Sequence, residues 1–212
     1  MNTTDWDHYY RQPYKLNTFL KRIVTRRIIR YLNRTMKPAH QFSLIEFGGG
    51  NSCFYIPFEQ NFRPSIYNVI DNNPLGLQHL EQRVPHSSSL KLIQQDIMSF
   101  DQPQPQLFSD VVFSVGLIEH FSVEDTRRAI IAHLNVLKPG GILILGFPTP
   151  TLLYRFARKI SEAMNQWIFH DERPLKINEV LETLNPYCEV LESHIIYSII
   201  FTQAFVIARK KE

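Results

Sequence analysis

Short runs of apolar residues alternate along this chain with segments in which apolar residues recur every three or four positions. The short runs predict strands, because an unbroken apolar run of this length fits a strand that is buried on both faces. The spaced segments predict helices with one apolar face. Strands are predicted at 44–47, 66–71, 90–96, 110–115 and 142–147, and helices at 15–37, 74–84 and 123–137. Strands that alternate with helices predict right-handed βαβ units, and therefore an α/β fold with a mostly parallel, doubly wound sheet.

The alternation stops at about residue 148. Residues 148–178 carry a helical pattern rich in aromatic and basic residues, which predicts an insertion. A short helix is predicted at 177–184, and two apolar, β-rich segments follow at 188–198 and 202–208 with no helix between them. Two such segments in succession predict a hairpin that closes the edge of the sheet in the antiparallel sense.

The composition predicts one globular domain in a reducing compartment. The chain has 212 residues, of which 44% are hydrophobic and 20% charged, and its formal net charge is only +3. Global charge therefore indicates no particular partner. The two cysteines, Cys53 and Cys188, lack metal-ligand spacing and do not predict a disulfide framework. No export leader opens the chain and no apolar run reaches membrane-spanning length, so we predict a cytoplasmic protein.

The first 40 residues are predicted to form a helical arm with one basic face. The polar side of the predicted helix carries Lys21, Arg22, Arg26, Arg27, Arg30 and Arg34. Two interpretations stay open: the solvated face of a helix that packs on the sheet, or a peripheral contact with anionic lipid or a phosphorylated substrate. No motif accompanies this charge that would indicate nucleic-acid binding.

Each of the first three predicted strands ends in an acidic residue, and a run of glycines follows the first. The acids are Glu46, Asp71 and Asp96, and the glycines are Gly48, Gly49 and Gly50. Glycine lets the backbone approach a ligand closely. An acid about twenty residues beyond the glycines, here Asp71, can accept hydrogen bonds from ribose hydroxyls. Because ligands of parallel sheets gather at the carboxyl ends of the strands, this pattern predicts a nucleoside site.

Two residues disfavour a dinucleotide at this site. The NAD fingerprint has a third glycine where this chain has Cys53, and the charge of Glu46 would repel a pyrophosphate. The same carboxylate suits an ammonium group. The pattern therefore predicts a nucleoside that carries a positive charge, and an NAD-dependent oxidoreductase is the weaker interpretation.

Residues 42–147 resemble the class I S-adenosylmethionine-dependent methyltransferases, with motifs in that family's usual order. The most specific match is the segment 134–143 (LNVLKPGGIL), which is similar to the family's turn before the fifth strand. The other matching segments are 46–50 (EFGGG), 69–71 (VID), 95–97 (QDI) and 110–121 (DVVFSVGLIEHF). Ser52 stands where the family usually has a third glycine, and its hydroxyl can cap the helix that follows.

The resemblance implies a Rossmann-like sheet of seven strands with helices on both faces and an antiparallel last strand. It also implies S-adenosylmethionine as cofactor, and a role for each motif residue. Glu46 would take the methionine ammonium; Gly48, Gly49 and Gly50 would line the methionine and ribose; Asp71 would hold the ribose hydroxyls, with Asn72 beside the adenine; Asp96 and Ile97 would hold the adenine; and Ser114 would lie under the sulfonium.

His120 is the candidate general base, because it follows the fourth predicted strand near the expected methyl group. The alternative is a histidine that caps or packs the next helix. Glu119 could orient His120, help to hold a metal ion, or be an acid at a helix start. No metal-ligand spacing is complete, so no metal site is predicted. Residues 170–173 could touch the acceptor or form a polar loop.

These features predict a methyltransferase with residues 1–40 as an arm or lid and residues 41–212 as the cofactor-binding domain. Tyr9, Tyr10 and Tyr14 would close over the cofactor or fix the arm by packing. The basic arm and the insertion favour a small-molecule acceptor that is anionic or lipid-linked, such as a glycan or glycolipid intermediate. The alternative is a protein that binds the cofactor, or acts as a scaffold, without turnover. The oligomeric state is not predicted.

Overall fold

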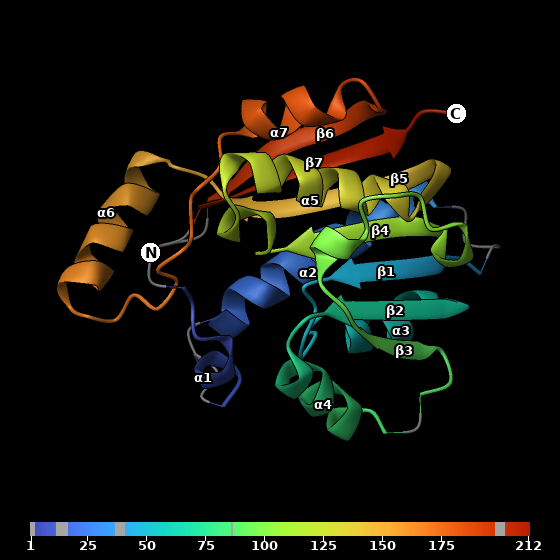
Figure 1. Cartoon of the computed structure of the whole chain (residues 1–212), viewed down its shortest axis with the longest axis horizontal. Helices are drawn as coiled ribbons and strands as arrows, with labels where there is room; N and C mark the ends of the chain where they lie inside the picture. Colours follow the sequence, from blue (N-terminus) through green and yellow to red (C-terminus); the bar gives the residue numbers. More distant parts are fainter. Residues whose placement is uncertain (1–2, 12–16, 37–40, 86, 198–201) are drawn as a thin grey trace. The chain divides into compact units, whose positions relative to one another are not determined.

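The computed structural model describes residues 3–11, 17–36, 41–85, 87–197 and 202–212 (Figure 1). The chain divides into two compact units, one formed by residues 6–95 and one by residues 1–5 and 96–212. Each unit is described by itself below.

The unit of residues 6–95 holds three parallel strands and four helices. The strands are β1 (Ser43–Phe47), β2 (Ile66–Asp71) and β3 (Leu90–Gln94), and the helices are α1 (Trp6–Arg11), α2 (Asn17–Thr35), α3 (Tyr55–Phe62) and α4 (Pro74–Arg83). β2 lies between β1 and β3 and pairs with both in parallel, with Phe47 opposite Ile70 and Asp71 opposite Gln94. This register brings the carboxyl ends of β1 and β2, which carry Glu46 and Asp71, to the same edge.

The unit that contains residues 96–212 holds four strands. They are β4 (Ser109–Val115), β5 (Leu137–Pro148), β6 (Cys188–Tyr197) and β7 (Thr202–Lys210), with helices α5 (Val123–Asn135), α6 (Leu152–Ala163) and α7 (Ile177–Leu184) and the short 3-10 turns η1 (Ile97–Ser99), η2 (Pro105–Leu107) and η3 (Ile118–His120). β4 pairs with β5 in parallel, and β7 lies antiparallel to both β5 and β6. The predicted C-terminal hairpin is therefore confirmed.

The strands form a seven-stranded sheet in the order β3-β2-β1-β4-β5-β7-β6. Strands β1, β2 and β4 are almost entirely buried, as for Val111, Val112 and Phe113 in β4, whereas β3, at the edge of the sheet, has no fully buried residue. Such burial is the physical reason why the strands read as unbroken apolar runs. The predicted fold class, a mostly parallel Rossmann-like sheet with antiparallel pairing at the end of the chain, is confirmed.

Two local features differ from the predicted elements. Within the predicted helical arm, residues 6–11 form a separate helix α1, outside the helix predicted at 15–37. Residues 138–141, between the predicted helix and the predicted fifth strand, lie inside strand β5, where Ser109 pairs with Leu137 and Val111 pairs with Ile142, so that four residues bulge out of the ladder. Gly140 has φ +73° there, a left-handed conformation that a glycine adopts without strain.

Helix α2 separates apolar from basic residues as predicted. Val24, Ile28 and Leu32 are buried, whereas Arg22, Arg26, Arg27, Arg30 and Arg34 are exposed. The sequence assigns residues 1–40 to an arm or lid and residues 41–212 to the cofactor-binding domain. This division depends on what the arm does, and it stays a prediction.

Helix α6 carries large apolar side chains that are exposed to solvent. Leu152 is 86% exposed, Phe156 65% and Met164 58%. These residues recur at a helical spacing, so they share one face of α6, which stands out from the strands of its unit (Figure 1). Among the described residues, no helix is long and apolar enough to cross a bilayer.

Candidate cofactor and acceptor sites

The turn after β1 requires its glycines. Gly48 and Gly50 have φ of +66° and +36°, which favour glycine. A Cβ on Gly49 would lie 2.6 Å from Cγ1 of Val69 and 2.9 Å from Cδ of Glu46. The backbone therefore packs directly over Glu46, and this turn admits no larger residue at position 49.

Glu46 is a buried carboxyl with two hydroxyl donors. Its side chain is 3% exposed, and Oε2 accepts hydrogen bonds from the Ser52 hydroxyl at 2.6 Å and from the Tyr67 hydroxyl at 2.7 Å. Burial raises the pKa of Glu46 to about 7, although both hydrogen bonds act in the opposite sense. An ammonium group placed beside this carboxyl would favour its ionised form.

Ser52 connects this carboxyl to the helix that follows. Its Oγ donates to Glu46 and accepts hydrogen bonds from the backbone N–H groups of Phe54 and Tyr55, both at 3.1 Å. Ser52 thus bonds N–H groups at the start of α3, although the N-cap residue of that helix is Phe54. A glycine at this position would leave these groups without the hydroxyl.

Asp71 ends β2 at the same edge as Glu46. Its Oδ1 accepts from the backbone N–H of Asn73 at 2.8 Å, and the backbone N–H groups of Gly50 and Asn72 also lower its pKa. Burial outweighs these bonds and leaves the pKa of Asp71 above its ordinary value. Asn72, the residue predicted to lie beside adenine, is exposed.

Helix α1 lies against this group. The ring of Tyr10 occupies the space that a Cβ on Gly50 or Gly76 would need, and the Tyr10 hydroxyl is hydrogen-bonded to Asp71. Burial raises the pKa of Tyr10 well above its ordinary value. Asn73 fixes α1 further, because its side-chain amide donates to Asp7 at 2.6 Å. Of the three tyrosines predicted as a lid, Tyr14 lies outside the described residues.

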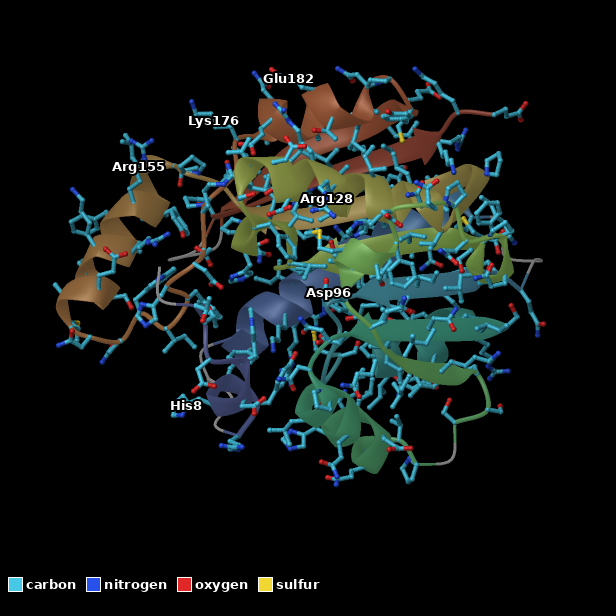
Figure 2. The ribbon with its side chains drawn as sticks, viewed as in Figure 1. His8, Asp96, Arg128, Arg155, Lys176 and Glu182 are labelled. Atoms are coloured by element: carbon cyan, nitrogen blue, oxygen red, sulfur yellow. The ribbon has the colours of Figure 1, made fainter. Side chains whose placement is uncertain are left out.

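The remaining predicted cofactor residues belong to the unit that contains residues 96–212. Asp96 is exposed and caps η1 by accepting from the backbone N–H of Met98 at 2.9 Å (Figure 2). Ile97 is buried. Ser114 is fully buried, and its hydroxyl is bonded to Nε2 of His133 at 2.9 Å. His133 is a structural residue of α5, since its Nδ1 also bonds to the Ala129 carbonyl at 2.7 Å.

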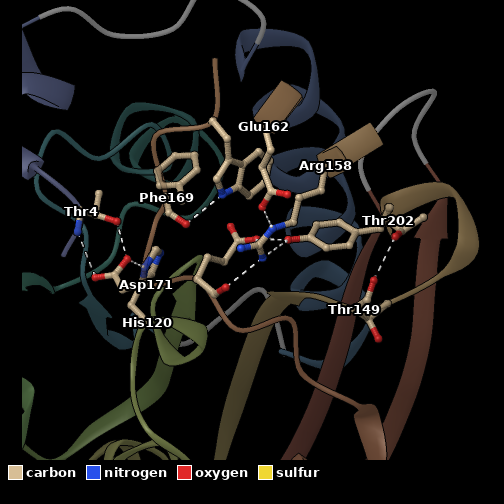
Figure 3. Close-up of polar contacts among 11 residues, drawn as sticks. Thr4, His120, Thr149, Arg158, Glu162, Phe169, Asp171 and Thr202 are labelled. Atoms are coloured by element: carbon tan, nitrogen blue, oxygen red, sulfur yellow. Dashed lines mark hydrogen bonds and ion pairs between the residues drawn. The ribbon is translucent and has the colours of Figure 1, made fainter. Parts of the chain in front are cut away.

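His120 lies in a hydrogen-bonded chain with Asp171 and Thr4 (Figure 3). Nδ1 of His120 is 2.9 Å from Oδ1 of Asp171, and the backbone N–H and hydroxyl of Thr4 both donate to Asp171. Burial opposes the charge on Asp171, but the bonds from Thr4 and His120 outweigh it and hold the pKa of Asp171 below its ordinary value. The ionised carboxylate can only accept, so Nδ1 of His120 is the donor.

This bond fixes the tautomer of His120. Burial lowers the pKa of His120, and the neighbouring Asp171 only partly offsets that effect. At neutral pH the imidazole is therefore neutral, with its proton on Nδ1 and its lone pair on Nε2. A histidine held in this way can accept a proton or ligate a metal.

Two carboxyl groups lie close to His120, one buried and one partly buried. Glu119 is 2% exposed, and its Oε2 has no hydrogen-bond partner among the described residues. Glu172 accepts from the Tyr154 hydroxyl, and Nη1 of Arg158 lies 3.9 Å from its Oε1. Burial raises the pKa of Glu172 to about 7 and that of Glu119 well above its ordinary value, and the charge of Glu172 adds to the shift on Glu119.

The sequence did not reveal how the insertion contributes. The sequence of residues 170–173 fits either an acceptor contact or a polar loop, and the structure places Asp171 against His120 and Glu172 against α6. Tyr154 and Arg158, which are four residues apart on α6, were not identified as functional candidates. Their spacing places them on one face of the helix, and this was the only available signal.

The comparisons with known proteins agree with this architecture. Residues 45–145 match a family model described as a methyltransferase domain. No curated protein sequence matches the chain. The magnesium protoporphyrin IX methyltransferase ChlM from Synechocystis PCC 6803 with bound SAH is similar in structure, with a TM-score of 0.75 and 14% identity over 97% of this chain and 93% of that one.

Two further solved structures share the fold. The N-methyltransferase NodS from Bradyrhizobium japonicum WM9 in complex with S-adenosylhomocysteine has a TM-score of 0.65 and 17% identity, over 88% of this chain and 87% of that one. The 1,6-didemethyltoxoflavin-N1-methyltransferase of Burkholderia thailandensis has a TM-score of 0.71 and 13% identity, over 98% and 86%. Residues 45–145 of this chain thus match the model of a methyltransferase domain, and the chain shares the fold of these methyltransferases.

Proposed function

We propose that the protein transfers the methyl group of S-adenosylmethionine to a small-molecule acceptor that is anionic or lipid-linked. The observation that carries the proposal is the buried carboxyl of Glu46 beneath the glycine turn, with Asp71 at the end of the neighbouring strand. Burial disfavours the ionised form of the Glu46 carboxyl, and the ammonium of a bound methionine would stabilise that ionised form.

The cofactor contacts are assigned residue by residue. Glu46 takes the ammonium, the turn of Gly48, Gly49 and Gly50 lines the methionine and ribose, and Asp71 takes the ribose hydroxyls. Asn72, Asp96 and Ile97 are assigned to the adenine and Ser114 to the sulfonium end. Support for Ser114 is weakest, because its hydroxyl is already bonded to His133.

Methyl transfer from a sulfonium is an in-line displacement, and positioning supplies much of its acceleration. An oxygen acceptor must also lose a proton. His120 is the proposed proton acceptor, because Asp171 holds its Nδ1–H and leaves Nε2 with the lone pair. Glu119, next to it in η3, is proposed to support His120, by orienting it or by helping to hold a metal ion.

The acceptor class is inferred from α6 and α2. Leu152, Phe156, Ile160 and Met164 form an exposed apolar face on α6, and Arg155 and Lys159 on the same helix are exposed cations (Figure 2). An apolar face beside cations fits a lipid-linked anionic molecule or a membrane surface. The exposed arginines of α2 support the same inference and a peripheral membrane contact. The proposed location is the cytoplasm.

Calorimetry with S-adenosylhomocysteine and with NAD tests the cofactor assignment. We expect S-adenosylhomocysteine to bind and NAD not to bind, and tighter binding of NAD would overturn the proposal. The alternative function, a cofactor-binding scaffold, predicts binding without turnover. It would be favoured if the protein bound S-adenosylmethionine but formed no S-adenosylhomocysteine with lipid and glycan extracts of its own cells.

A further inference from the structure

Three potential metal ligands from two distant parts of the chain meet in the unit that contains residues 96–212. Glu119 and His120 lie in η3, and Glu172 lies beyond α6 in the insertion. One ligand atom of each residue lies within 4.8 Å of the other two. We propose that Glu119, His120 and Glu172 bind one divalent transition-metal ion of the Mn²⁺ or Zn²⁺ kind.

The spacing is close to what such an ion requires. Ligand atoms about 2.1 Å from an ion in tetrahedral arrangement lie about 3.4 Å apart. Side-chain rotations that move the ligand atoms by about 1 Å would therefore close the site. One imidazole and two carboxylates form a donor set that suits Mn²⁺ and Zn²⁺ better than a purely oxygen-binding ion such as Ca²⁺.

Glu119 provides an independent reason for a cation. Its side chain is 2% exposed, and Oε2 has no hydrogen-bond partner among the described residues. A buried carboxyl oxygen without a partner is costly, and a bound cation would supply one. Its other oxygen, Oε1, faces Gly116, where an added Cβ would come within 3.6 Å.

The surroundings of His120 match those of a metal-bound imidazole. Histidine ligands usually donate their second ring N–H to a carboxylate, which fixes the ring and raises its basicity. Nδ1 of His120 makes this bond to Asp171 at 2.9 Å, and Thr4 holds Asp171 in turn. Nε2 then carries the lone pair for the ion. Asp171 is therefore a positioning residue of the proposed site.

Two arginines border the cluster: Arg158 contacts Glu172 itself, and the buried Nε of Arg173 has no hydrogen-bond partner among the described residues. Arg173 bonds through both terminal nitrogens to Glu179, at 3.0 and 2.7 Å, and through one of them to Thr126 at 2.9 Å. Arg158 donates to the Glu172 carbonyl at 2.9 Å and lies 3.9 Å from Oε1 of that residue. The competing explanation of the cluster is that Glu119 and Glu172 share one proton. The experiment must distinguish a shared proton from a bound metal ion.

The metal site bears on the proposed reaction without depending on it. With an ion bound, Nε2 of His120 is a ligand and not a base, and the ion lowers the pKa of an acceptor oxygen bound to it. Binding of the ion needs neither the acceptor nor methyl transfer. Failure of this inference would therefore leave the proposed function intact, and S-adenosylhomocysteine binding measured on the same sample reports on that function separately.

The test is a titration of the chelator-treated full-length protein with Mn²⁺, followed by electron paramagnetic resonance, and with Zn²⁺, followed by calorimetry. We expect one ion per chain. Glu119→Gln and Glu172→Gln should each weaken binding at least tenfold, and Asp171→Asn should weaken it less, by way of the orientation of His120. Glu182→Gln, which changes an exposed acid on α7, is the matched control and should bind like the wild type (Figure 2).

The wild-type titration decides the matter even if a variant fails to fold. Absence of a one-equivalent Mn²⁺ or Zn²⁺ site in the wild type overturns the proposal and leaves the shared proton as the explanation. Unchanged affinity in folded Glu119→Gln and Glu172→Gln also overturns it, because the ion would then bind elsewhere. Thermal unfolding with and without Mn²⁺ gives a second readout, since a specific ion should stabilise the wild type more than Glu119→Gln.

Discussion

The hydroxyl of Tyr10 is hydrogen-bonded to the carboxyl of Asp71, and its ring fills the space between Gly50 and Gly76. Asp71 is the residue proposed to hold the ribose. The aromatic side chain of α1 thus occupies a position that the cofactor is expected to need, and the two must compete for the same carboxyl unless α1 moves.

Tyr10→Phe should therefore bind S-adenosylhomocysteine more tightly than the wild type. The substitution keeps the ring and removes the hydrogen bond that the ribose must replace. A net hydrogen bond contributes about 1 kcal/mol, which corresponds to about fivefold in affinity. Calorimetry measures the change, and Tyr9→Phe is the control because Tyr9 bonds to Lys21 instead.

Weaker binding by Tyr10→Phe would reverse the interpretation. The hydroxyl would then contact the bound cofactor, and α1 would act as the predicted lid that orders over the ligand. Slower hydrogen exchange of residues 6–11 on addition of S-adenosylhomocysteine would accompany that result.

Cofactor affinity should depend on pH through Glu46. The pKa of this buried carboxyl in the free protein is raised to about 7, and the ammonium of the ligand requires the ionised form. Below pH 7 binding must first remove a proton, so affinity should fall by up to tenfold per pH unit between pH 7 and pH 5. Calorimetry of wild type and Glu46→Gln over this range checks the prediction. An equal pH dependence in both would assign it to another group.

The same group should affect folding stability in the opposite direction. Because the folded-state pKa of Glu46 is raised, the folded protein holds a proton between about pH 4.5 and 7 that the unfolded chain has lost. Stability from this group is therefore present at low pH and decreases as the pH rises, by about 3 kcal/mol at most. Urea unfolding at pH 5 and pH 8 should show a smaller pH-dependent loss for Glu46→Gln than for the wild type.

The cofactor-side geometry could be predicted from the sequence because its residues are close together in the chain. A glycine turn, the acid before it and the acid after the next strand fall within residues 46–71, and parallel strand pairing alone brings them to one edge. Ser52 was predictable for the same reason, since capping is a local interaction. Strands β1, β2 and β4 were predictable because their burial on both faces leaves a largely apolar run.

The acceptor-side cluster could not be predicted in this way. Glu172 is more than fifty residues from Glu119, in an insertion with no fixed spacing to η3, so a search for metal-ligand spacing finds no complete set. Tyr10 was recognised only as one of several tyrosines. Its position depends on the packing of α1, and nothing in a six-residue helix specifies which ring meets Asp71.

Replacing His120 should reduce turnover without abolishing cofactor binding. His120→Ala removes either the proton acceptor or the ligand of the ion that lowers the pKa of the acceptor oxygen. A general base typically contributes 10²–10⁴-fold, and the variant should lose about that much in kcat. S-adenosylhomocysteine affinity should change little, because no proposed cofactor contact involves His120. His170→Ala, which alters an exposed histidine next to Asp171 in the chain, is the control. If His120→Ala kept most of its turnover, His120 would have no chemical role in the reaction. If the variant lost cofactor binding as well, His120 would be a residue that maintains the structure of the site.

Helix α6 should mediate binding to anionic membranes. Phe156 is 65% exposed and Leu152 86%, so changing them removes apolar contact area without disturbing the core. Phe156→Asp should reduce cosedimentation with phosphatidylglycerol vesicles. Tyr187→Asp, at a residue that is 50% exposed outside α6, should not. Arg155 and Lys159 predict that binding weakens as salt increases and is lost on neutral phosphatidylcholine vesicles. Equal binding by Phe156→Asp and the wild type would restrict α6 to contacts with the acceptor or with another protein.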